Sequence, residues 1–146
     1  MMKSNLLIAF VFSIFLAGCQ TSGVLLRETP LGVSETRKVI MSVIGEVREV
    51  SENGRELFSK YYDRKGNPIQ SMDMAKERYY SHLIVLGDRR PYDISVEVMV
   101  EARDSDGGWE LVDRDDHKAQ VLADKLKRAL NQSRDSRNVI DDFRSF

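Results

Sequence analysis

Five aspartates are the residues whose crowding first suggests chemistry, because neighbouring carboxylates can hold Ca²⁺. The spacing departs from the helix-loop-helix calcium pattern, in which glycine stands at the sixth loop position. Turn formation and helix capping explain these residues without an ion, so the sequence predicts no metal site. The five aspartates bracket one expected hairpin and the start of the last expected helix. They are Asp104, Asp106, Asp113, Asp115 and Asp116.

Two histidines and two glutamates are the other candidates for acid–base chemistry. His82 falls in an apolar and aromatic run, where a half-buried sheet residue is expected, and His117 stands at the start of the last helix. Glu97 and Glu101 share one face of an expected strand, which a solvated face explains better than a catalytic pair. The chain also lacks a Gly-x-Ser-x-Gly nucleophile elbow and a glycine-rich phosphate loop. We therefore expect neither enzyme activity nor a cofactor.

The single cysteine, Cys19, stands directly after a leader of the secretory kind. Lys3 gives the leader a positive start, and an apolar stretch then ends in Leu16-Ala17-Gly18-Cys19. This stretch is shorter than the about 20 residues that span a bilayer. Its last four residues match the lipobox, so the leader resembles that of bacterial lipoproteins.

The resemblance implies a covalent lipid anchor. In that family the signal, here residues 1–18, is cut between Gly18 and Cys19. The Cys19 thiol receives a diacylglyceryl group, and the new amino terminus commonly receives a further fatty acid, such as palmitate. A single acyl chain binds a membrane only reversibly, whereas two or more anchor stably. Gln20 in place of aspartate implies the periplasmic face of the outer membrane, or the plasma membrane if the source has only one membrane.

Composition describes one ordinary globular domain. The chain has 146 residues, with 22 Lys and Arg against 23 Asp and Glu, which leaves room for one domain. A formal charge of −1 argues against nucleic acid as a partner. One cysteine excludes an internal disulfide. We expect a lipidated tether over residues 19–32, a domain over 33–132 and a polar tail over 133–146.

The spacing of apolar residues predicts an α+β fold. We expect an antiparallel sheet of four or five strands, with an N-terminal and a C-terminal helix packed on one face. The first helix is expected over 34–45, capped by Ser34 and ended by Gly45, although its β-branched residues also fit a strand. Asn53-Gly54 predicts a hairpin turn. The expected strands cover 46–52, 55–62, 77–86, 92–103 and 109–112, and a helix capped by Asp115 or Asp116 follows and ends near residue 132.

The strand expected over 77–86 is apolar on both of its faces, so the face outside the core needs cover. If the core takes Tyr79, Leu83 and Val85, the outward side chains are Tyr80, Ile84 and Leu86; the opposite assignment stays open. We expect a non-enzymatic structural or protein-interaction module that binds another envelope protein through this strand. The alternative is an envelope enzyme or a small-ligand-binding lipoprotein with an unrecognised site.

Overall fold

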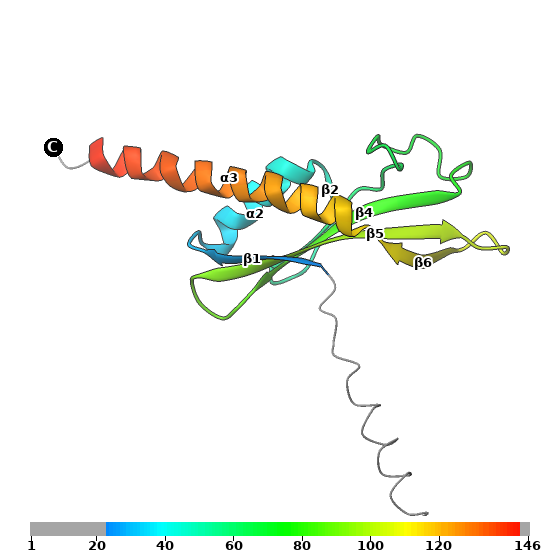
Figure 1. The fold of residues 1–146 in the computed structure, drawn as a ribbon, viewed down its shortest axis with the longest axis horizontal. Helices are drawn as coiled ribbons and strands as arrows, with labels where there is room; N and C mark the ends of the chain where they lie inside the picture. The colour runs from blue at the N-terminus through cyan, green and yellow to red at the C-terminus, as the bar shows by residue number, and fades with distance from the viewer. Residues whose placement is uncertain (1–22, 144–146) are drawn as a thin grey trace, which may run out of the picture.

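Residues 23–143, the part of the chain that this computed structural model describes, form an antiparallel sheet with two helices (Figure 1). The lipobox and the rest of the leader lie outside the described residues. The strand order is β1-β5-β4-β3-β2, and β6 pairs with β5 beyond the end of β1. The α+β class is as expected. The elements are β1 Val24–Thr29, α2 Val33–Ile44, β2 Val47–Val50, β3 Glu56–Ser59, β4 Glu77–Leu86, β5 Tyr92–Arg103, β6 Trp109–Arg114 and α3 Asp116–Phe143.

The long strands β4 and β5 form the centre of the sheet, with the bounds that the sequence predicts. They are paired along their whole length, from Glu77 opposite Ala102 to Leu86 opposite Asp93. Alternate side chains therefore point to opposite faces. One face is buried and includes Tyr79, Leu83 and Val85, which resolves the open assignment of this strand.

Both helices contribute residues to one buried cluster. Ile40 of α2 and Leu126 of α3 lie in it together with Leu83 and Val96 of the sheet. α2 begins after Gly32, whose carbonyl accepts the Thr36 N–H at 2.8 Å. The prediction of Ser34 as its cap is therefore wrong. Gly45 ends the helix as expected, with a φ of +76° that suits glycine.

α3 begins at the cap that the sequence predicts. The Asp115 carboxylate accepts the N–H of Lys118 at 2.8 Å and contacts its ammonium group at 3.1 Å. Burial on its own raises the pKa of Asp115. The hydrogen bonds and charge of Lys118, with the charge of His117, outweigh burial and hold the pKa below its usual value.

The segment expected as a tether is part of the fold from Val24 onward. β1 pairs with β5, with Val24 opposite Val96 and Leu26 opposite Ile94, and Leu31 is fully buried. The sheet therefore has six strands rather than four or five. Pro30 and Gly32 do interrupt regular structure, but only between β1 and α2.

The segment expected as a tail from residue 133 continues the last helix. α3 runs to Phe143, and Figure 1 shows it extending past the edge of the sheet. Once a helix has begun, each added residue contributes its own backbone hydrogen bond. The end expected near residue 132 is therefore wrong.

Candidate functional site

The face of β4 that points away from the buried cluster carries the three residues expected as an interaction surface. Tyr80 and Ile84 are half-buried there, and Leu86 is 40% exposed. Register places this face beside the matching faces of β3 and β5, since Ile84 lies opposite Glu56 on one side and Ser95 on the other. We call this surface the outer face.

His82 stands at the middle of the outer face and is 14% exposed. Its ring stacks on Phe58 of β3, with the centroids 4.4 Å apart and the planes 6° from parallel. Nε2 lies 2.7 Å from a carboxylate oxygen of Glu56, and Nδ1 lies 3.2 Å from one of Glu97. As the sequence predicts, His82 is a half-buried sheet residue, held between two carboxylates.

This histidine and its two glutamates do not form a metal site. The ring nitrogens point in different directions, so carboxylates bound to each of them cannot converge with the ring on one ion. Across the part of the chain that the structure describes, no group of three His, Cys, Asp or Glu residues is placed to hold a metal ion.

Arginines alternate with aromatic rings along the rest of the outer face. The Arg78 guanidinium lies 3.8 Å from the ring centroid of Tyr61 and 4.2 Å from that of Trp109. Its Nε donates to Glu101 at 2.5 Å. Arg48 lies 4.4 Å from the same Tyr61 ring and donates to its hydroxyl. We call the following six side chains the Arg–aromatic array: Arg48, Phe58, Tyr61, Arg78, Tyr80 and Trp109.

Local backbone features aim two members of the array. Arg48 is the extra residue of a β-bulge, because Val47 pairs with Ser59 while Glu49 pairs with Phe58. A bulge redirects the side chain that it holds. The second member is Tyr61, whose neighbour Tyr62 pairs with Tyr79 through two backbone hydrogen bonds of 2.9 Å.

The ring of Tyr62 lies on the buried side, where its hydroxyl contacts Ser81 at 3.1 Å. Burial raises the pKa of Tyr62. The preceding residue, Tyr61, therefore turns to the outer face.

Tyr80 links the array to the predicted surface. Its ring meets that of Tyr61 edge-on, with the centroids 5.7 Å apart. Burial raises the pKa of Tyr80 above its usual value, and the nearby Glu101 carboxylate raises it further. The phenol therefore stays neutral near pH 7 and can donate a hydrogen bond to a partner.

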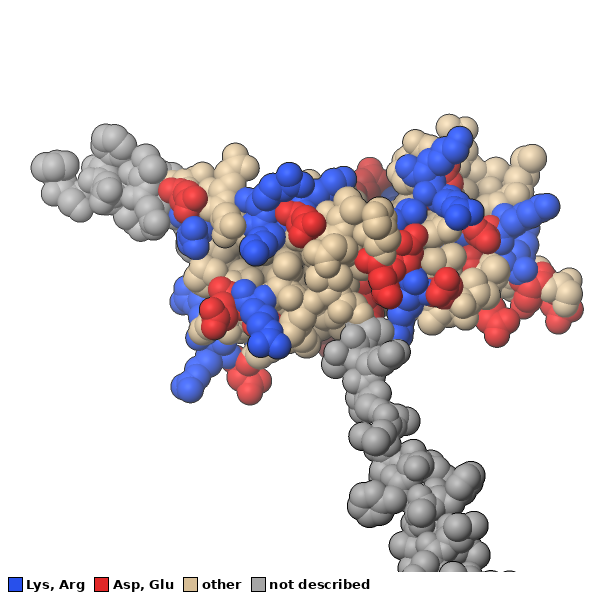
Figure 2. All heavy atoms as spheres, in the orientation of Figure 1, with Lys and Arg blue, Asp and Glu red and all other residues tan. Residues whose placement is uncertain are grey.

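Of the remaining candidates from the sequence, Asp113, Asp115 and Asp116 line one pocket. Asp104 holds its own turn, accepting the N–H groups of Asp106 at 3.0 Å and Gly108 at 2.6 Å. Asp115 caps α3. Glu97 contacts His82 and Glu101 contacts Arg78, so the two glutamates serve different partners. Both signs of charge are interspersed over the view in Figure 2.

Sequence reasoning missed Arg48, Tyr61 and Trp109. They come from a bulge, from the segment after β3 and from β6, so strand register alone brings them together. Alternation along β4 was a usable signal for Arg78 and His82, which share the face of Tyr80.

Comparison with known protein families, curated proteins and solved structures finds no match to this chain. Among the residues described, neither helix is both long and apolar enough to cross a membrane.

Proposed function

We propose that this chain is a lipid-anchored protein of the bacterial envelope that binds another envelope protein through the outer face. The observation that carries the proposal is the Arg–aromatic array, which includes Tyr80, together with the neighbouring side chains of Ile84 and Leu86. Arginine, tyrosine and tryptophan are the residues that dominate binding energy at protein interfaces. Here they are held in place by one another before any partner arrives, which lowers the entropy cost of binding.

The lipobox supports the anchored part of the proposal. Cys19 would carry the diacylglyceryl and N-acyl lipids, and Gln20 favours the periplasmic face of the outer membrane, or the plasma membrane in a source with one membrane. Gly23, where β1 is about to begin, comes four positions after Cys19. Four extended residues span at most about 14 Å, so the domain would stay close to the headgroups.

The same proposal includes the finer arrangement of the helices, which we place on one face of the sheet. Three observations support it: α2 and α3 contact each other, their buried residues share one cluster with β4 and β5, and both lie on the same side of the strands in Figure 1. Neither of the two helices in the described part of the chain then covers the outer face.

Capture of the partner in the intact envelope tests the proposal. The variant Tyr80→Ser, Ile84→Thr, Leu86→Ser should remain folded, because none of the three belongs to the buried cluster, yet it should capture much less partner after crosslinking. The matched control is Met41→Ser with Val121→Thr, since these helix residues are 41% and 42% exposed. Full capture by the folded triple variant would contradict the proposal. Unfolding of the triple variant would also contradict it, because the three side chains would then belong to the core.

A further inference from the structure

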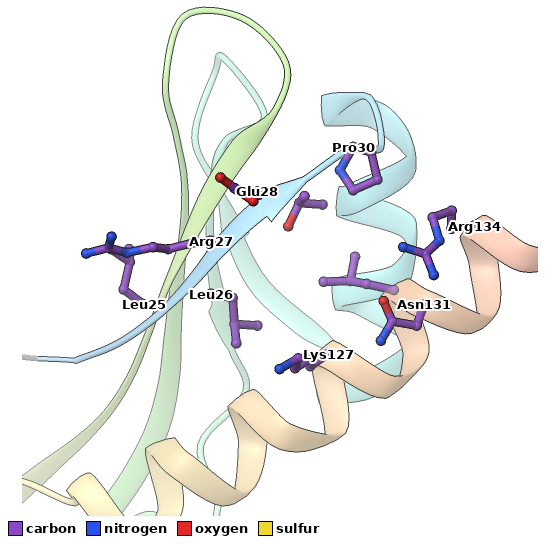
Figure 3. Close-up of a pocket in the computed structure, with 10 residues that line it drawn as sticks. Leu25, Leu26, Arg27, Glu28, Pro30, Lys127, Asn131 and Arg134 are labelled. Carbon is purple, nitrogen blue, oxygen red and sulfur yellow. The ribbon is translucent and has the colours of Figure 1, made fainter.

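A groove between the edge strand β1 and helix α3 lies apart from the outer face. Its volume is about 280 Å³. One wall is the continuous stretch from Leu25 to Pro30, and the other is one side of α3 with Lys127, Leu130, Asn131 and Arg134. Figure 3 shows Leu26 between the two elements, with Lys127 and Asn131 projecting from α3 toward β1.

The free edge of β1 supplies the hydrogen-bonding groups of this groove. Among the described strands, β1 stands at one end of the order and pairs with β5 on one side only. In an antiparallel strand about half of the backbone N–H and C=O groups point to each side, so the other half point outward. An edge of this kind is a template for another extended chain.

The ladder between β1 and β5 is also interrupted within the groove. Pairing is regular to Leu26 and resumes at Thr29. Between them Glu28 has a φ of +60°, which is uncommon outside glycine, and its N–H donates to the Asp93 carboxylate at 3.0 Å. Such local strain tends to occur at functional sites.

The charges of the groove select for an acidic occupant. Lys127 and Arg134 bring two cations to the α3 wall, whereas the Arg27 guanidinium points away from α3 (Figure 3), and Glu28 adds a single carboxylate. Leu26 and Leu130 supply the apolar part of the lining. Arg134 also contacts Asp135 at 3.1 Å, but both side chains are at least half exposed, so this ion pair is weak and can be exchanged for a ligand.

We propose that this groove binds an extended acidic segment of a partner protein, which adds as a further strand beside β1. Backbone hydrogen bonds to β1 would provide affinity, and carboxylates facing Lys127 and Arg134 would provide selectivity. This site goes beyond the proposed function and does not depend on it, because it uses none of the outer-face residues.

Two short blocked peptides test the proposal on the full-length protein in detergent. One alternates valine with glutamate, and the other alternates valine with lysine. The glutamate peptide should bind at least tenfold more tightly, and it should slow amide exchange along β1. Equal affinity, or effects on amides elsewhere only, would overturn the proposal. Slow amide exchange at the β1 edge before any peptide is added would also overturn the proposal, because another segment would already be paired with β1. A dimer that dissociates on dilution and competes with the peptide would overturn it too, because a second copy of the chain would then occupy the groove.

Backbone methylation separates strand addition from charge attraction alone. In an extended peptide the N–H groups of alternate residues point to the same edge. Methylating either all glutamate or all valine nitrogens should therefore abolish binding in one case and spare it in the other. An equal effect in both cases would contradict strand addition.

Substitutions on α3 test whether this wall of the groove determines the preference for an acidic peptide. Lys127→Glu should lower affinity for the glutamate peptide at least tenfold. Lys125→Glu is the control, because Lys125 is exposed on the same helix and does not line the groove. Equal losses in the two variants would overturn the assignment of this wall.

Discussion

Thr36 carries a hydroxyl that is fully buried and has no hydrogen-bond partner among the described residues. A buried hydroxyl without a partner is costly, since water would otherwise bond to it. Thr36→Val keeps the shape and removes the polar group, so it should raise the free energy of unfolding by about 1 kcal/mol. Chemical denaturation measures this change.

Thr36→Ser is the control for that substitution, because it keeps the hydroxyl and removes the methyl group. It should lower stability, since a buried methyl contributes about 1 kcal/mol. A loss of stability in Thr36→Val would mean that the hydroxyl has a partner that the described residues do not supply.

At the scale of the element, the cap of α3 gives a pH dependence whose sign follows from the pKa of Asp115. That pKa is lowered in the folded protein, so its stabilising contribution is complete above the unfolded value of about 3.9. The contribution is lost as the pH falls through the lower, folded pKa.

Acid denaturation of Asp115→Asn checks that prediction. Asparagine also caps helices well, so this variant should keep the helix and show a shallower loss of stability at acid pH. Asp116→Asn is the control, because the Asp116 side chain is exposed. An acid dependence of Asp115→Asn identical to that of the parent protein would contradict the account of the cap.

The strand β1 gives the second prediction at this scale. A chain that begins at Gly23 should fold, whereas one that begins at Val33 should lose several kcal/mol of stability, because it lacks both β1 and Leu31. Leu31→Ala alone should cost about 2–5 kcal/mol. Thermal unfolding distinguishes the two truncated chains. Equal melting temperatures would show that residues 24–32 add no stability to the domain and act only as a tether.

The elements differ in how far the sequence could predict them. β4 and β5 follow directly from alternation and apolar content, so their bounds agree with the prediction. β1 was missed because its three apolar residues are consecutive rather than alternating, and the irregularity at Arg27 and Glu28 follows them directly. The end of α3 was missed because residues 131–138 are all polar, so the apolar spacing that marks a helix stops before the helix does.

The candidate site was only partly predictable for a related reason. Which face of β4 is outward follows once the register to β3 and β5 is known. Arg48 and Trp109 reach that face from distant segments through bulges and strand pairing, and no local pattern in the sequence records these contacts.

At the scale of the whole molecule, the proposed membrane attachment depends on one thiol, that of Cys19. Cys19→Ser should abolish incorporation of labelled fatty acid and leave a precursor or a soluble form, because serine offers no thiol for the diacylglyceryl group. The folded domain should be unaffected, since Cys19 precedes the described residues. Labelled fatty acid still entering the variant would contradict the lipoprotein assignment.

The central claim is that the outer face contacts a protein in the envelope. Site-specific photo-crosslinking tests it most directly, with the probe placed at Leu86 or at Val121, which are 40% and 42% exposed. We expect a discrete crosslinked protein from position 86 and little or none from position 121. No crosslink from position 86, or the same products from both positions, would contradict the account.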